Sequence, residues 1–231
     1  MKKMAIIGPC LPERSDKEAL INSLGFLSNF TSLDYYDPFD SYEPNDNHEV
    51  FVSYWQKRIL NMANRYDYFI GFSLGGMLIK KCLANNSIKP SLLFSTPTVI
   101  DKQLHKSLTA VISLLHQNRN KEAIYLHNKL VHAPYDSPEP MISEHKYPEV
   151  RQRLTQGLSY VLNMGNISVE KNRQKLMRQF VGESSALVTL SHIPMNEKAC
   201  TFVVPKAGMR MLQNNPSFCQ SHILEFLKEH N

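Results

Sequence analysis

The sequence predicts an α/β fold in which helices cover both faces of a mostly parallel central sheet. Short apolar runs typical of buried strands alternate with amphipathic segments typical of helices, and glycine or proline ends most of the runs. A stretch with helical signals alone, residues 98–165, interrupts this alternation. We therefore expect one structural domain in three parts: a first part of the α/β core at 1–97, a helical lid insertion at 98–165, and a second core part at 166–231.

The first core part begins with two strand signals on either side of a helix signal. The apolar run Met4–Ile7, closed by a Gly-Pro pair, indicates a buried strand. A capping box that begins at Ser15 predicts a helix that ends at Gly25. Residues Thr31–Tyr36 predict a second strand, which stops before Pro38.

The rest of the first core part continues the same alternation. Six acidic residues between Asp34 and Glu49, with no basic residue among them, indicate a solvated loop. The helix that follows carries its apolar residues on one stripe, at Phe51, Trp55, Ile59 and Met62. We then expect a strand, a helix and a strand, at Tyr66–Gly71, Gly75–Leu83 and Ser91–Phe94.

The insertion at 98–165 contains helical patterns and no strand pattern. Its apolar residues recur at helical spacing in three groups: Leu104, Leu108, Val111 and Leu115; Ile124 and Leu130; and Val150, Leu154, Leu158 and Val161. The segment 132–148 holds four prolines and indicates an ordered loop. Strand signals return near 176–181 and 200–204, and a closing helix carries Cys219, Ile223, Phe226 and Leu227.

The charge balance argues against a nucleic-acid-binding protein. The chain has 26 Lys and Arg against 21 Asp and Glu, a net charge of +5, and the positive charges are scattered. The densest basic cluster indicates a solvated face rather than a phosphate site: Lys171, Arg173, Lys175 and Arg178.

The apolar and cysteine patterns argue against membrane, secreted and metal-binding proteins. No apolar run approaches the roughly 18 residues that a membrane span needs. Lys2 and Lys3 precede an apolar stretch that is too short for a signal-peptide core. The cysteines show no metal-type spacing and indicate reduced thiols: Cys10, Cys82, Cys200 and Cys219. We therefore expect a cytoplasmic protein with no membrane span, no metal site and no cofactor.

Residues 71–76 form the one motif that carries chemistry. The stretch Gly71-Phe72-Ser73-Leu74-Gly75 has the form G-x-S-x-G, and it lies between a predicted buried strand and a predicted helix. A nucleophile on such a sharp strand-to-helix turn is crowded by its neighbours in the chain. The residues two positions before it and two positions after it must therefore have almost no side chain. The helix N-terminus beside Ser73 also favours negative charge.

With this motif in this position, the chain resembles the α/β-hydrolase superfamily along nearly its whole length. It is most similar to the compact carboxylesterase and thioesterase-like members. The resemblance implies the α/β-hydrolase fold, with Ser73 at the nucleophile position. It also implies that Gly71, Gly75 and Gly76 form the nucleophile elbow.

The resemblance further implies an oxyanion hole made of two backbone N–H groups. One belongs to Leu74, and the other comes from the loop after the first strand. The family usually carries His-Gly at the start of that loop, whereas this chain has Gly8-Pro9. Because proline has no N–H, Cys10 is the expected second donor.

The sequence departs from the family pattern at the two other positions of the catalytic triad. The stretch Gly182–Val188 matches the segment that normally carries the acid, but it places Ser185 at the acid position. The stretch Ala207–Leu212 matches the segment that normally carries the base, but it places Met209 at the histidine position. A serine without an adjacent base is a poor nucleophile at neutral pH.

Other residues offer a relocated base or acid. His192, in the region after the penultimate strand, is the best substitute base. The other candidate bases are two histidines of the insertion, His132 and His145. The candidate acids are Asp136 of the insertion, Glu183 close to the expected acid position, and Asp101 just after the strand that precedes the insertion.

Three functions are therefore open at the level of the sequence. The first is hydrolysis of an acyl ester or thioester through Ser73. The second is a non-catalytic pseudoenzyme that binds an acyl or small apolar ligand, or a protein partner. The third is a non-hydrolytic enzyme that uses the same pocket. In each of these functions we expect the ligand or substrate to be a small molecule or a carrier-bound acyl group. The sequence predicts neither the oligomeric state nor whether the protein is catalytically active.

Overall fold

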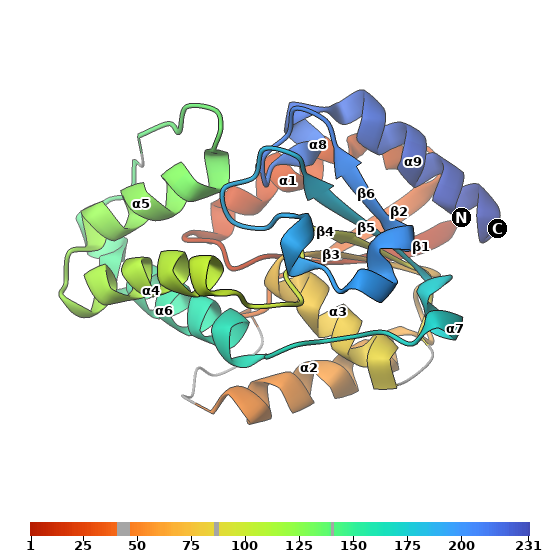
Figure 1. The fold of residues 1–231 in the computed structure, drawn as a ribbon, viewed down its shortest axis with the longest axis horizontal. Helices are drawn as coiled ribbons and strands as arrows, with labels where there is room; N and C mark the ends of the chain where they lie inside the picture. The colour runs from red at the N-terminus through yellow and green to blue at the C-terminus, as the bar shows by residue number, and fades with distance from the viewer. Residues whose placement is uncertain (41–46, 86–87, 140) are drawn as a thin grey trace.

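The central element of the fold is a fully parallel β-sheet (Figure 1). A computed structural model describes residues 1–40, 47–85, 88–139 and 141–231, and this part of the chain contains six strands in the order β2-β1-β3-β4-β5-β6. The strands are β1 (Lys2–Ile7), β2 (Thr31–Tyr36), β3 (Tyr68–Phe72), β4 (Ser91–Phe94), β5 (Met177–Gly182) and β6 (Thr201–Val204). The predicted α/β fold with a parallel sheet is confirmed.

Helices precede or follow every strand. The α-helices are α1 (Lys17–Ser23), α2 (His48–Met62), α3 (Leu74–Asn85), α4 (Lys102–His116), α5 (Asn120–His132), α6 (Tyr147–Asn163), α7 (Lys171–Gln174), α8 (Met211–Asn214) and α9 (Pro216–Glu229). The 3-10 helices are η1 (Arg14–Asp16), η2 (Gly25–Leu27), η3 (Glu144–Lys146), η4 (Leu190–His192) and η5 (Met195–Cys200). In the described ranges, no helix combines the length and apolar character that crossing a bilayer requires.

The sheet is buried on both faces. In β1, Ala5 and Ile7 belong to one apolar cluster and Met4 and Ile6 to another, and all four are fully buried. The first cluster includes α2 and α3, whereas the second includes α8 and α9, and Figure 1 shows these helix pairs on opposite sides of the sheet. This double burial explains why the strands appear in the sequence as continuous apolar runs.

Helices α4, α5 and α6 lie together at one end of the molecule, between β4 and β5 in the sequence (Figure 1). Helix α4 packs against both α5 and α6, and α6 also contacts α3. The apolar stripes predicted for α4 and α6 are buried, as expected for helices that pack against one another. These three helices cover the carboxyl-end side of the sheet near the start of α3.

The start of α1 differs from the prediction. Ser15 is not the capping residue, because the reciprocal capping box joins Glu13 to Asp16 around the short helix η1. Helix α1 begins at Lys17, directly after this 3-10 turn. The sequence pattern located the helix correctly and misplaced the residue that caps it.

Two charged stretches that the sequence predicts to be solvated contain buried residues. Asp37, in the acidic stretch 34–49, is 2% exposed and pairs with Arg153 at 2.6 Å, while Glu43 and Asp46 lie outside the described residues. Arg178, in the basic cluster, is 8% exposed and donates hydrogen bonds to two carboxylates of α9. In both stretches a long-range partner stabilises the buried charge, which a local pattern does not reveal.

Candidate active site

Ser73 occupies a strained turn between β3 and α3. Its φ angle is +47°, in the left-handed region that costs an L-residue roughly 1–2 kcal/mol. The turn is fixed on both sides, because Ser73 N donates to Phe94 O at 2.9 Å and Ser73 O accepts from Met77 N at 3.0 Å. This geometry is that of a nucleophile elbow, in which the hydroxyl stands at the carboxyl end of the sheet.

Close packing explains the three glycines of the elbow. A Cβ atom on Gly75 would lie 2.2 Å from the carbonyl oxygen of Ile7, and one on Gly76 would lie 1.9 Å from Thr96 Oγ1. A Cβ atom on Gly71 would lie 2.6 Å from Gly76 Cα. The approach of Gly75 to the end of β1 also brings the start of α3 beside the loop that follows β1.

Ser73 lines a cavity of about 460 Å³. The loop after β1 and the ends of β3 and β4 form its base, and α4, α5 and α6 contribute apolar side chains, among them Leu104, Leu108, Leu158 and Val161. Its volume lies within the roughly 300–1,000 Å³ that is usual for small-molecule sites. The cavity is therefore large enough for a small ligand.

The two expected oxyanion donors come from separate segments of the chain. Leu74 is the first residue of α3, and Cys10 lines the cavity from the loop after β1. Within the described ranges, neither backbone N–H donates to another protein group. The Cys10 thiol is oriented away, toward Arg153 O at 3.2 Å, and burial raises its pKa to about 12, so this thiol stays protonated.

Met209 lines the same cavity as Ser73. It lies in the loop after β6, and its backbone carbonyl accepts a hydrogen bond from Ser95 Oγ at 3.1 Å. In the described part of the chain, Ser73 Oγ forms no hydrogen bond with any histidine. The thioether of Met209 cannot accept the proton that a serine nucleophile must lose.

Ser185 lies in the turn after β5, away from the cavity lining. Its Oγ accepts hydrogen bonds from the N–H groups of Leu187, at 3.4 Å, and Val188, at 3.2 Å. The neighbouring Glu183 accepts from Lys206 N at 2.9 Å, which connects the turns after β5 and β6. Both side chains thus hold local turns, and neither forms a hydrogen bond with a histidine.

His192 is paired with a carboxylate, but it does not line the cavity. Its Nδ1 accepts from Thr189 N at 2.9 Å, and its Nε2 lies 3.2 Å from Asp101 Oδ1. Asp101 caps α4 by accepting from Leu104 N, and this hydrogen bond is the main reason that the pKa of Asp101 is lowered. The proposed substitute base and one of the alternative acids therefore meet at the start of α4.

Other histidines do line the cavity. His127 and His132 reach it from α5, whereas Asp136 and His145 are exposed and do not line it. Burial lowers the pKa of His127 to about 4, and burial followed by the charge of Arg210 lowers the pKa of His132. Both imidazoles are therefore neutral at neutral pH.

Comparison with known proteins identifies the fold. No family model and no curated protein sequence matches the chain. Solved structures do match, and one is an alpha/beta hydrolase enzyme from a Medee basin deep-sea metagenome library, at TM-score 0.72 and 12% identity over 98% of this chain and 89% of that one. A hydrolase from Pseudomonas aeruginosa matches at TM-score 0.65 and 14% identity, over 98% and 89%. MenH from S. aureus matches at TM-score 0.62 and 15% identity, over 99% and 94%.

This chain has the α/β-hydrolase fold. Within that fold, Ser73 lies in the turn between β3 and α3, and the helices between β4 and β5 contribute to the cavity that it lines. No group of His, Cys, Asp and Glu residues in the described ranges is arranged to hold a metal ion.

Arg153 of α6 anchors the loop that carries the expected second oxyanion donor. Its Nη2 pairs with Asp37 at 2.6 Å, and its Nε donates to Leu11 O at 3.1 Å. Both charged side chains are buried, so each needs the other. The sequence analysis missed this pair, because its members lie 116 residues apart and neither belongs to a motif.

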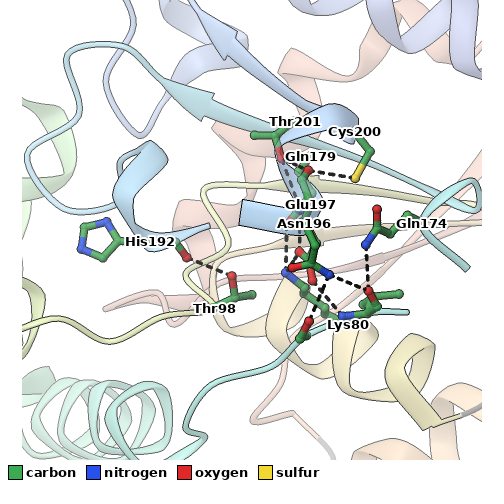
Figure 2. A network of polar contacts seen from close by, with 11 residues as sticks. Lys80, Thr98, Gln174, Gln179, His192, Asn196, Glu197, Cys200 and Thr201 are labelled. Atoms are coloured by element: carbon green, nitrogen blue, oxygen red, sulfur yellow. Dashed lines mark hydrogen bonds and ion pairs between the residues drawn. The ribbon is translucent and has the colours of Figure 1, made fainter. Parts of the chain in front are cut away.

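A buried polar network connects α3 with β5 and η5 (Figure 2). Lys80 of α3 forms an ion pair with Glu197 and donates to Gln179 Oε1 at 3.3 Å. Glu197 also accepts from Val169 N at 2.8 Å, which attaches the chain segment after α6. Burial lowers the pKa of Lys80, and Glu197 opposes that shift. Figure 2 shows the ring of His192 turned away from this network.

Proposed function

We propose that this protein binds an acyl-type ligand in the cavity beside Ser73 and does not use Ser73 as an efficient nucleophile. The observation that carries the proposal is Met209, which lines the same cavity as Ser73 and which the family resemblance of the sequence assigns to the histidine position. Ser73 is left without a hydrogen-bonded base among the described residues. Loss of triad members typically lowers turnover by roughly 10⁴–10⁶, while binding is retained.

The cavity supports a ligand with an apolar chain. Leucine and valine side chains of α4 and α6 line it, and its polar side chains come from other segments, among them α5, the loop after β6 and the segment after β1. An apolar pocket with a small number of placed polar groups is typical of small-molecule sites. The two backbone N–H groups beside Ser73 offer hydrogen bonds to a carbonyl oxygen of the ligand.

Binding of a neutral acyl probe tests the proposal. We expect octanamide to bind the protein in isothermal titration calorimetry, and Leu158→Phe to weaken the binding by filling the cavity. Leu60→Phe, on the exposed side of α2, is the matched control and should leave the affinity unchanged. No binding of octanamide by the folded parent protein would contradict the proposal.

Labelling with a fluorophosphonate tests the second half of the proposal. This reagent reacts with a serine whose hydroxyl has been activated, so we expect no label at Ser73 after a time in which an active serine hydrolase is fully labelled. Ser73→Ala provides the background. Label on Ser73 that is absent from this variant would contradict the proposal and identify a working nucleophile.

Hydrolysis of an ester or thioester is the second candidate function. The strained φ of Ser73 and the two N–H groups without a protein acceptor favour it, because both features serve a tetrahedral intermediate. His132, a neutral imidazole that lines the same cavity, would then have to act as the base. Ser73-dependent turnover of p-nitrophenyl acetate that His132→Gln abolishes would establish this function.

A further inference from the structure

Arg210 is a positive charge in the cavity lining without a carboxylate partner. It follows Met209 in the loop after β6 and is half-buried. Its described polar contact is with His132, whose two ring nitrogens both lie 3.1 Å from Arg210 Nη1. Four arginines of the described ranges form ion pairs with Asp or Glu, namely Arg14, Arg119, Arg153 and Arg178, and Arg210 is not one of them. A guanidinium stays charged in proteins, so its partial desolvation here is uncompensated.

The neighbouring wall on α5 is also polar. His127, Asn128 and His132 all line the cavity, and His127 is only 7% exposed. No described residue forms a hydrogen bond with the buried Nδ1 atom of His127. A buried polar atom without a partner costs free energy unless a ligand or water satisfies it. Arg210 and this polar wall on α5 together indicate a polar ligand group at this end of the cavity.

The carboxylates that line the same cavity do not neutralise Arg210. Glu13 pairs with Lys146, and Asp16 accepts from Glu13 N at 3.1 Å in the capping box. Glu139 is exposed, and none of the three forms an ion pair with Arg210. The guanidinium is therefore available to an anion that enters the cavity.

We propose that Arg210, with His127 and His132, binds the carboxylate of a ligand whose apolar chain occupies the rest of the cavity. This inference rests on the proposed function and specifies its ligand class, a carboxylic acid with a short apolar chain. The planar guanidinium donates two parallel N–H bonds that match the two oxygens of a carboxylate. A neutral imidazole has one N–H to add, and the leucines of α4 and α6 accommodate the chain.

A matched pair of probes tests the inference. We expect calorimetry at pH 7.5 to show that octanoate binds at least tenfold more tightly than octanamide, which has the same chain and no charge. Arg210→Gln should remove this preference and leave octanamide binding within twofold of the parent. Arg210→Lys should keep part of the preference, because it keeps the charge and loses the planar fork. Arg65→Gln, which removes an exposed arginine outside the cavity, should change neither affinity.

The other outcomes separate this inference from the proposed function. Equal binding of octanoate and octanamide by the parent protein would overturn the carboxylate subsite and leave the acyl-binding function in place. Binding of neither probe would overturn both.

A second measurement uses the parent protein alone, so it does not depend on whether the Arg210 variants fold. In the parent protein, octanoate should raise the pKa of His132 in an NMR titration, because the carboxylate offsets the charge of Arg210, while octanamide should not. An unchanged pKa of His132 at saturating octanoate would overturn the subsite.

Discussion

Ser95 Oγ donates a hydrogen bond to the backbone carbonyl of Met209 at 3.1 Å, which joins the loop after β6 to the carboxyl end of β4. Ser95 itself has a φ of +45°, so its hydroxyl is presented by a constrained turn. Because β4 is the neighbour of β3, the contact holds position 209 close to the strand that precedes Ser73. The fold thus fixes the place of residue 209 at the cavity that Ser73 lines.

The strain at Ser73 predicts an unusual effect of glycine on stability. Glycine adopts a positive φ without the steric cost that any other residue has, and this gain outweighs the greater flexibility of glycine in the unfolded chain. The Ser73→Gly variant should therefore be more stable than the Ser73→Ala variant, with a free energy of unfolding that is larger by about 1 kcal/mol. Urea unfolding of the two variants measures the difference, and equal stabilities would show that the turn is relaxed.

Packing of the elbow predicts a large cost at Gly76. Its Cβ atom would lie 1.9 Å from Thr96 Oγ1, so Gly76→Ala should lower the free energy of unfolding by about 2–3 kcal/mol. Gly25→Ala is the matched control, because no atom lies within 4 Å of the added Cβ, and its effect should stay within about 0.5 kcal/mol.

Combining Gly76→Ala with Thr96→Ala identifies the cause of that cost. Thr96→Ala removes the closest atom and leaves the threonine Cβ position 3.0 Å away. The double variant should therefore be more stable than the sum of the two single changes predicts, by about 1 kcal/mol or more. Strict additivity would mean that the two residues do not clash.

The burial of His127 predicts a loss of stability in weak acid. The folded protein holds its pKa at about 4, below the ordinary value of 6.5, so the unfolded chain binds more protons between these values. The free energy of unfolding should fall as the pH drops from 6.5 to 4, by at most about 1.4 kcal/mol per pH unit from this residue, and level off below. His127→Gln should flatten this part of the stability curve.

A second histidine variant provides the control for this pH dependence. His116→Gln removes an exposed imidazole of α4 that lies outside the cavity. It should leave the slope of stability against pH between 4 and 6.5 unchanged. A slope that survives His127→Gln would assign the acid sensitivity to other groups.

The sequence predicted the parts of this molecule that local patterns encode. The β–α alternation, the apolar stripes of α4 and α6 and the sharp strand-to-helix turn at Ser73 each follow from neighbouring residues, and the structure contains them. The pair Arg153–Asp37 and the free charge of Arg210 depend on contacts between distant segments. One signal was present for Arg210, because it adjoins Met209, which the family resemblance of the sequence assigns to a site position.

If Met209 and Ser185 stand at the base and acid positions, as the family resemblance implies, two changes should restore activity. Met209→His would place an imidazole in the cavity that Ser73 lines, on a loop that Ser95 already holds. Ser185→Asp would supply a carboxylate that can keep the two backbone hydrogen bonds that Ser185 Oγ now accepts. Since triad members act as a unit, the double variant should raise turnover of p-nitrophenyl acetate by about two orders of magnitude or more.

The single changes and a serine control decide how this rescue is interpreted. Ser185→Asp alone should have no effect, because there is no base for it to orient, and Met209→His alone should recover part of the gain. Adding Ser73→Ala to the double variant should abolish the gain, which distinguishes the elbow from a reactive imidazole elsewhere. Each variant has to retain the circular dichroism spectrum and thermal transition of the parent, because Met209→His buries a polar ring. A folded double variant no faster than the parent would mean that the oxyanion donors or the cavity have changed as well, and that the site has been reshaped for binding.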